Sequence, residues 1–415
     1  MSVAAPKTIA HSALGLAMAA AVLLGAADPA HAAVAARGQY QGPSYASTSS
    51  PGSPSGSKPE SKLWYADGSW WGVLYDGPST DHHIFRLDPA TQVWQDTGIV
   101  VDGRPKARSD VLWDGSHLYV ATHLFTESPS SGGRSSLYRF SHVAGSGQWT
   151  LDPGYPATIN TWKTETLVLA KDSSGQLWAT WAQQNQVWAN TTSGDDARWG
   201  TPFPVPGAGG LSSDDISSVI AFGGNRIGLL WSNQVSDTMH FAVHDDAVAD
   251  DRAFGAPEVV IGGPGTNLAD DHINLKADAS GRVYATTKTS KTSSLDPFIF
   301  LHVRSVDGRW ASTIFGLVGD KHTRPIVLLD ETTRVLHLFA TAGQSGDVIF
   351  RKTTSMDAPS FAPGQGTALI TAPDVNNATS TKQSVSAETG TVILGTADDT
   401  RLYWHWWDPP VGAQA

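Results

Sequence analysis

The feature that most constrains the fold of this chain is a plan of two alternating runs around a tight turn, which recurs seven times. In its clearest copy, residues 270–289 (DDHINLKADASGRVYATTKT), polar groups come first, an alternating apolar run follows, and a Gly-containing turn leads into a second run from Arg282 to Thr287. Period-two alternation on both sides of such a turn predicts a β-hairpin with one buried face. The copies begin near Trp64, Val111, Leu167, Val219, Leu275, Val327 and Val385.

Six of the copies carry a second half, which consists of a third strand, a polar turn, an aromatic residue and a Gly/Pro-rich fourth strand. Four short strands every ~50 residues, with no helical pattern, predict an all-β protein, a β-propeller of seven four-stranded blades. The seventh copy ends after its third strand, RLYWHWW. We therefore expect an N-terminal segment to supply the missing strand and close the ring.

The beginning of the chain has the pattern of a secretory signal, which we assign to residues 1–32. Lys7 precedes an apolar run from Ala13 to Ala26, and Ala30-His31-Ala32 is typical of a cleavage site. The apolar run is too short for a membrane-spanning helix, and there is no cysteine for disulfides or thiolate metal sites. The sequence thus predicts an extracellular protein that is not held in a membrane.

Residues 33–61 are rich in Gly, Ser and Pro, and this composition predicts a flexible linker before a propeller over residues 62–410. A strand could still form around residues 33–40. The net charge of −11 argues against nucleic acid as a partner, and the sequence has no stripe of Lys and Arg that would suggest otherwise. We expect a monomer.

Two turns in the repeat carry a spaced Ser, Asp and Trp. They are Ser193-Gly-Asp195-Asp-Ala-Arg-Trp199 and Ser305-Val-Asp307-Gly-Arg-Trp310. Each resembles a shortened Asp-box of the sialidase-like (BNR-repeat) propellers, and this resemblance implies a secreted protein that acts on or binds carbohydrate. Sialidases would also need three arginines, and only Arg108 and Arg324 stand at strand starts. The polar residues are more similar to those of seven-bladed polysaccharide lyases and glycosidases.

In a propeller, the starts of the first strands and the ends of the second strands open on one face around the central channel. Titratable or polar groups occupy these positions in every blade, as a single site at the channel mouth would need. The catalytic candidates are His123, His272, His322, Arg108, Arg324, Asp110, Glu165 and Asp271, and the candidates for substrate binding are Lys62, Trp64, Lys288, Trp181, Lys382 and Asn233. Trp162 is a further residue that could stack on a sugar.

Three chemistries can be built from this set. In a lyase, His123, His272 or His322 would abstract the C5 proton of a uronate, while Arg108, Arg324 or Lys288 neutralised its carboxylate. In a hydrolase, Asp110 or Glu165 would act with Asp271 across a glycosidic bond. In a metal site, Asp270, Asp271 and His272 with His322 would offer ligands that suit Ca²⁺ or Mn²⁺. The sequence assigns no metal ligand and leaves the cofactor open, with Ca²⁺ as the candidate.

The sequence therefore predicts a secreted enzyme, a lyase or a glycoside hydrolase, that cleaves an acidic polysaccharide at one site at the channel mouth. The alternative is a non-catalytic lectin or a cell-surface interaction propeller, which would repeat one pocket between successive blades. The strand-start residues differ from blade to blade, and this favours one asymmetric site.

Overall fold

The computed structural model describes residues 1–5, 34–56 and 58–411. Contacts divide the chain into two units, Met1–Ala32 and Ala33–Ala415, and the second holds all the strands of the described residues. The predicted signal, residues 1–32, lies outside the described residues except for residues 1–5. Among the described residues, no helix has the length and apolar character needed to cross a membrane.

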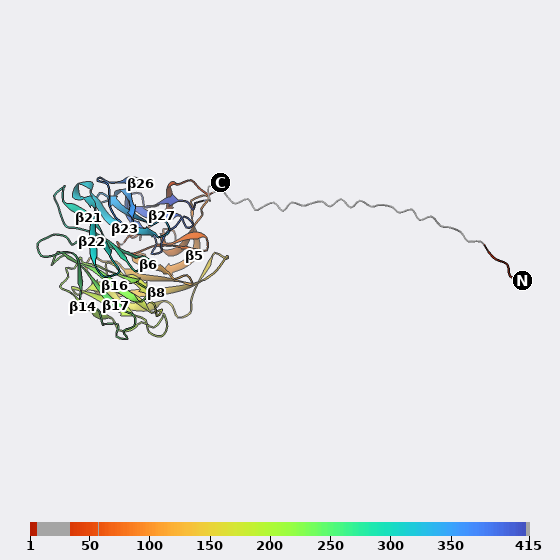
Figure 1. The fold of residues 1–415 in the computed structure, drawn as a ribbon, viewed down its shortest axis with the longest axis horizontal. Helices are drawn as coiled ribbons and strands as arrows, with labels where there is room; N and C mark the ends of the chain where they lie inside the picture. Colours follow the sequence, from red (N-terminus) through yellow and green to blue (C-terminus); the bar gives the residue numbers. More distant parts are fainter. Residues whose placement is uncertain (6–33, 57, 412–415) are drawn as a thin grey trace. The chain divides into compact units, whose positions relative to one another are not determined.

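The second unit is all-β, as the repeat predicts, and apart from one short 3-10 helix (Val318–Asp320) its regular elements are antiparallel strands. Five of its sheets are single blades whose strands pair in chain order (Figure 1). The first blade holds β2 (Leu63–Ala66), β3 (Ser69–Asp76), β4 (Asp81–Leu87) and β5 (Trp94–Asp102). The second holds β6 (Ala107–Trp113), β7 (His117–Leu124), β8 (Ser130–Val143) and β10 (Ala157–Lys163), with β9 (Gln148–Leu151) paired to β8.

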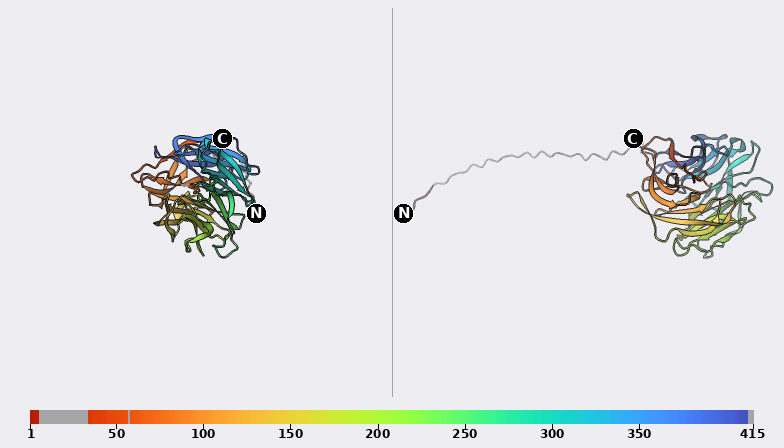
Figure 2. Two further views of the ribbon diagram at one scale, coloured as in Figure 1. Left: turned by 90° about the vertical axis from the view of Figure 1, so that its left-hand side faces the viewer. Right: turned by 180° about the vertical axis from the view of Figure 1, so that it is seen from behind.

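The next three blades follow the same plan. The third blade holds β11 (Val168–Lys171), β12 (Leu177–Gln183), β13 (Gln186–Thr191) and β14 (Phe203–Gly209). The fourth holds β15 (Ser217–Phe222), β16 (Arg226–Asn233), β17 (Thr238–Asp245) and β18 (Glu258–Gly262). The fifth holds β19 (Ile273–Ala277), β20 (Val283–Lys288), β21 (Pro297–Arg304) and β22 (Trp310–Leu317). Views from the side and from behind show the sheets grouped about a common centre (Figure 2).

The sixth sheet has seven strands because one long strand serves two blades. It contains β23 (His322–Asp330), β24 (Val335–Ala342), β25 (Asp347–Ser355), β26 (Thr367–Thr379), β27 (Thr391–Ala397), β28 (Leu402–Asp408) and β1 (Gly38–Ser44). The first part of β26 pairs with β25, and its last part pairs with β27. The sheet therefore combines the sixth blade with the seventh, which gives the predicted total of seven.

β1 pairs antiparallel with β28, so that Gly38 lies opposite Trp407 and Gln41 opposite Trp404. The seventh repeat thereby gains the outer strand that its sequence lacks. That this strand closes the ring remains a prediction.

The structure corrects the expectation of a flexible linker at residues 33–61. Beyond β1, this segment crosses toward the channel and becomes buried at Ser55, Glu60 and Ser61. Gly77, which follows β3, allows the segment to approach closely, since a Cβ on Gly77 would lie only 2.5 Å from the carbonyl oxygen of Ala46. A composition that is typical of linkers here serves tight packing. We call residues 45–61, apart from the undescribed residue 57, the mouth segment.

Large aromatic side chains fill the space between neighbouring blades. Trp64 and Trp71 of the first blade pack edge-on against Trp149 of the second, with ring centroids 5.5 Å apart in both pairs. All three side chains are buried. The burial of Trp149, and likewise of Trp94, shows that these two aromatics of the repeat pack in the interior.

Candidate active site

Three carboxylates meet where three consecutive blades begin. Glu165 precedes β11, Asp214 precedes β15 and Asp271 precedes β19, so each stands at the start of a first strand. One oxygen from each lies within 4.8 Å of the others. We call these three residues the carboxylate cluster. It includes two of the predicted catalytic residues, Glu165 and Asp271, and Asp214 comes from the same face.

The mouth segment places a lysine into the carboxylate cluster. Lys58 Nζ lies 2.5 Å from Oε1 of Glu165 and also contacts Asp271. The Lys58 side chain is only 12% exposed, so its ammonium is largely removed from water. One cation thus partly balances the charge of three acids, which reduces their mutual repulsion.

Glu165 has the properties of a proton donor. Burial raises its pKa above the ordinary value, and the nearby charge of Lys58 only partly opposes this effect. Its second oxygen, Oε2, is buried and forms no hydrogen bond with any described residue. A carboxyl group in this state tends to hold its proton, as the acid of a glycosidase must.

Asp271 lies in a different environment, although it belongs to the same cluster. Besides Lys58, it faces the ring of His272, whose Nδ1 lies 2.7 Å from Oδ1 of Asp271. Asp271 thus has a cation on one side and a ring nitrogen that can donate a hydrogen bond on the other, whereas Oε2 of Glu165 has no hydrogen-bond partner among the described residues. The two acids therefore differ in their electrostatic surroundings.

The imidazole of His272 is enclosed on both sides. Nδ1 also lies 2.5 Å from Asp270, and Nε2 is 3.3 Å from the hydroxyl of Thr323. Burial lowers the pKa of His272 to about 3, so the ring is neutral. Burial alone would raise the pKa of Asp270, but the hydrogen bond from His272 and the charge of Lys288 outweigh it and bring the value to about 2.

Several predicted site residues bind the mouth segment instead of facing solvent. Arg108 donates to the carbonyl oxygens of Ser53 and Gly52. His123 is fully buried, with Nε2 2.6 Å from Glu60 and Nδ1 3.0 Å from the carbonyl oxygen of Thr164. The contacts of these residues explain why the segment is ordered. The same contacts occupy the polar atoms of Arg108 and His123 that a substrate would need.

Three further predictions are corrected because the side chains are closed to a ligand. Trp64 is buried among Trp71 and Trp149, and Trp181 is fully buried with its Nε1 donating to Gln183 at 2.7 Å. His322 is fully buried against Phe315, and its Nε2 bonds to the carbonyl oxygen of Gln365 at 3.1 Å. These three side chains pack into the interior, and their place at the start or end of a strand does not reveal this.

The remaining candidates lie at different depths. Asp110 is fully buried and pairs at 2.6 Å with Lys382 inside the channel. Lys62 is buried against Glu60 at 2.8 Å, and Asn233 accepts a hydrogen bond from the backbone of Ser236 in its own loop. The other two candidates are Lys288 and Arg324. Lys288 pairs with Asp270 at 2.8 Å. Arg324 is half-buried, has a left-handed φ of 51° and donates to the carbonyl oxygen of Gln344.

A cavity of about 200 Å³ is lined by residues that lie close in the sequence to members of the carboxylate cluster. Trp162, three residues before Glu165, lines it together with Ser212, two residues before Asp214. Gln183 and Asn185 supply amides to the same cavity. An indole surrounded by amides and hydroxyls suits a sugar, which needs both stacking and hydrogen bonds.

Lys58 is the site residue that the sequence reasoning missed, because it lies in the stretch that reads as linker. One signal could have found it: Lys58 and Glu60 are charged residues directly before the first strand, at the end of a stretch that otherwise carries few charges.

The carboxylate oxygens have the chemistry of a Ca²⁺ site, but their arrangement does not fit the ion. Among the described residues, the candidate groups at the mouth are the carboxylate cluster and Asp270, Asp271 and His272. The first already surrounds the ammonium of Lys58, and Asp270 in the second is paired with Lys288. A dication would meet these cations at close range. We derive no step that requires a metal.

Comparison with known proteins supports the fold. No family model matches the chain, and no curated protein matches it in sequence. A polysaccharide lyase of family PL25, an ulvan lyase, is similar in structure, with a TM-score of 0.56 and 10% identity over 89% of this chain and 96% of that one. The polysaccharide lyase Uly1 (TM-score 0.48, 12% identity, 85% and 90% covered) and an α-L-arabinanase of Penicillium chrysogenum (0.43, 11%, 74% and 96%) are more distant. Such low identities show the fold alone.

Proposed function

We propose that this protein is a secreted enzyme that hydrolyses glycosidic bonds of a polysaccharide at the carboxylate cluster. The observation that carries the proposal is the pair Glu165 and Asp271, whose oxygens lie within 4.8 Å of each other and which share Lys58 but differ in their other neighbours. Two acids that differ in this way can divide the roles of proton donor and nucleophile. The likeness to an ulvan lyase supports the proposal only in that the same fold serves a polysaccharide lyase in another protein.

The separation of the two acids favours a retaining course, since retaining glycosidases place their carboxyl groups about 5–5.5 Å apart and inverting ones about 6.5–9.5 Å. In the first step, Glu165 gives its proton to the leaving oxygen as the glycosidic bond breaks, and Asp271 bonds to the anomeric carbon. Water then attacks that carbon, Glu165 takes a proton from the water, and Asp271 leaves as a carboxylate. Lys58 has to swing away from Asp271 before the first step, which its flexible side chain allows.

The surroundings of the carboxylate cluster support an acidic glycan as substrate. Arg324 forms no ion pair with a described carboxylate and can meet the acid group of a glycan, whereas Lys58 and Lys288 are already paired with acids of the site. The Trp162 cavity offers a stacking surface for the neighbouring sugar. A uronate-containing polysaccharide satisfies both features.

Lyase activity is the second candidate, because the neutral ring of His272 stands among these cations. Its two ring nitrogens already have partners in Asp270, Asp271 and Thr323. Proton abstraction by His272 would require Nε2 to leave Thr323, so we place hydrolysis first.

The test is a digest of the exported protein against a panel of uronate-containing and neutral polysaccharides, followed by reducing ends and by absorbance near 235 nm. New reducing ends without absorbance, lost in Glu165→Gln and Asp271→Asn but kept in the exposed control Asp307→Asn, are expected. Rising absorbance would replace hydrolysis with elimination, and retention on a glycan without any product would leave a lectin. N-terminal sequencing tests export, with cleavage expected after Ala32.

A further inference from the structure

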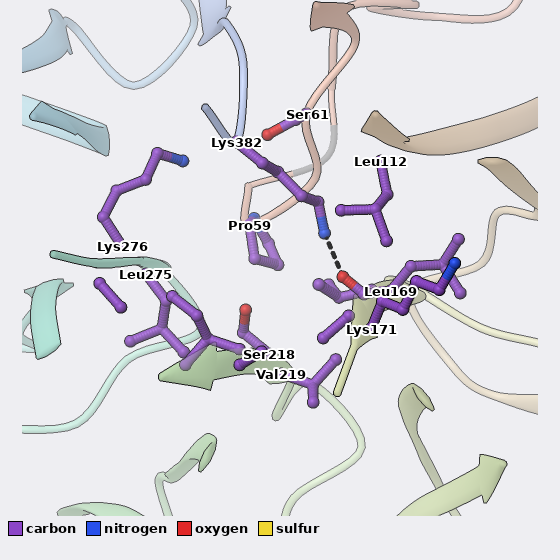
Figure 3. Close-up of a pocket in the computed structure, with 15 residues that line it drawn as sticks. Pro59, Ser61, Leu112, Leu169, Lys171, Ser218, Val219, Leu275, Lys276 and Lys382 are labelled. Carbon is purple, nitrogen blue, oxygen red and sulfur yellow. Dashed lines mark hydrogen bonds between the residues drawn. The ribbon is translucent and has the colours of Figure 1, made fainter. Parts of the chain in front are cut away.

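The central channel contains a second polar cavity, of about 180 Å³, below the mouth segment (Figure 3). Pro59 and Ser61 of the mouth segment line it together with Ser218 of β15. Two lysines line this cavity from different sides, Lys276 from β19 and Lys382 from the seventh blade. In Figure 3 the ammonium of Lys382 points to Leu169, and that of Lys276 points away from Val219. None of the steps proposed for the carboxylate cluster uses this cavity.

The two lysines differ in how their charge is balanced. Lys382 pairs with Asp110 at 2.6 Å and donates to the carbonyl oxygen of Leu169 at 2.5 Å (Figure 3). Lys276 is 5% exposed, yet its ammonium forms no hydrogen bond or ion pair with any residue that the structure describes. The ammonium itself is not fully buried, so it faces the space of the channel without a counterion among the described residues.

The charges around the cavity add up to an excess of one positive charge when both lysines are protonated. Lys276 and Lys382 contribute two positive charges, and Asp110, which also accepts from the backbone of Ser61 and Leu169, contributes one negative charge. Lys171, which also lines the cavity, is balanced by Asp114. The adjacent Lys62 is balanced by Glu60. The missing charge is therefore that of one monoanion.

We propose that the channel cavity binds a small organic carboxylate, with its charged end at Lys276 and its body against the aliphatic walls. Leu112, Val219 and Leu275 form those walls, while the hydroxyls of Ser61 and Ser218 can donate hydrogen bonds. A monoanion with an apolar or hydroxylated body matches this lining better than a doubly charged inorganic ion. The volume admits a six-membered ring, since cavities of about 150 Å³ accept benzene. The site therefore has room for a carboxylate whose body is about the size of a six-membered ring.

Burial and the charge of Lys382 lower the pKa of Lys276 to about 7, which agrees with an amine that lacks a counterion. A bound carboxylate would supply that counterion and favour the protonated form. Binding should therefore take up a proton near neutral pH.

The experiment is isothermal titration of the full chain with sodium glucuronate, sodium acetate, sodium sulfate and, as the neutral control, glucose. Saturable one-to-one binding of glucuronate or acetate, at least tenfold weaker in Lys276→Met and unchanged in the exposed control Lys106→Met, is expected. Absent binding of both carboxylates, or equal binding by Lys276→Met, would overturn the proposal. Sulfate binding more tightly than either carboxylate would overturn the assignment to organic acids.

A second measurement needs no variant, in case Lys276→Met does not fold. Reductive methylation with formaldehyde and dimethylamine-borane at pH 7, which releases no carboxylate, should modify Lys276 early, because its pKa is low and it lines a cavity. Peptide mass spectrometry should show that glucuronate or acetate, but not glucose, protects Lys276. Equal modification with and without carboxylate would contradict the site. Neither measurement depends on cleavage of a polysaccharide, so the failure of one proposal would not affect the other.

Discussion

Glu60 and His123 form a fully buried contact, with Oε1 of Glu60 2.6 Å from Nε2 of His123. The other oxygen of Glu60 pairs with Lys62 at 2.8 Å. Burial alone would raise the pKa of Glu60, but the charges of Lys62 and His123 outweigh it and lower the pKa to about 2. This contact fastens the mouth segment to the second blade.

Glu60→Gln should destabilise the protein by about 3–5 kcal/mol, because it leaves the buried charge of Lys62 without a partner. Urea denaturation at pH 7 measures the loss. The double variant Glu60→Gln/Lys62→Met should recover most of it, since it removes both charges. A single variant as stable as the unaltered protein would show that Glu60 does not hold the segment.

The same contact predicts a dependence of stability on pH. Because the pKa of Glu60 is lower in the folded state, at about 2, than its ordinary value of 4.5, its contribution is complete above pH 4.5 and is lost as the pH falls toward 2. The free energy of unfolding should decline less steeply across this range in Glu60→Gln than in the unaltered protein. Identical slopes would contradict the lowered pKa.

Lys58→Met should move the high-pH limit of hydrolysis upward by about one pH unit, since an opposite charge at this range shifts a pKa by about 1–3 units. Burial raises the pKa of Glu165 and Lys58 opposes it, so removal of the cation lets the acid keep its proton at higher pH. The pH profile of kcat/KM measures the shift, with the exposed Lys106→Met as the control. A profile that stays in place or moves downward would exclude Glu165 as the acid.

Lys276→Met should stabilise the protein at pH 6 by at least about 1.4 kcal/mol, the value of one pKa unit. The folded pKa of about 7 lies below the ordinary 10.5, so the unfolded state binds more protons between these values and the unaltered protein gains stability as pH rises. The advantage of the variant should therefore shrink from pH 7 to pH 10. Denaturation at pH 6 and pH 10 tests this, and a constant difference would contradict it.

Deletion of residues 34–44 should lower Tm and promote association. β1 covers the edge of β28, and Tyr40 stacks on His405 with ring centroids 5.7 Å apart. An uncovered edge strand is a template for pairing with another chain. Thermal unfolding and light scattering should separate this variant from a chain that starts at residue 34. Equal behaviour would show that β1 is dispensable and does not close the ring.

The fold could be predicted from the sequence because every blade repeats the same alternation and turn, and local patterns determine each hairpin. The function of the mouth segment could not, since its Gly, Ser and Pro residues give no periodic signal. Its partners are also remote: Glu60 and His123 are 63 residues apart, and Lys58 and Glu165 are 107 apart. Contacts of that kind arise only when the blades assemble.

The site was predicted in part for a related reason. Strand-start positions correctly brought Glu165 and Asp271 to one face, because propeller geometry alone determines that. The same positions could not show that Trp64, Trp181 and His322 turn into packed surroundings. Lys276 escaped attention because it lies within a first strand, where only the assembled channel shows that it lacks a partner.

The pairing of β1 with β28 also fixes where the two ends of the folded unit emerge. Gly38 lies opposite Trp407, so the strand that enters the unit and the strand that leaves it meet at one point. β1 then runs toward the channel mouth, which places this point on the opposite face. A support or a fused module attached at either end would therefore hold the molecule in the same orientation, with its mouth facing outward.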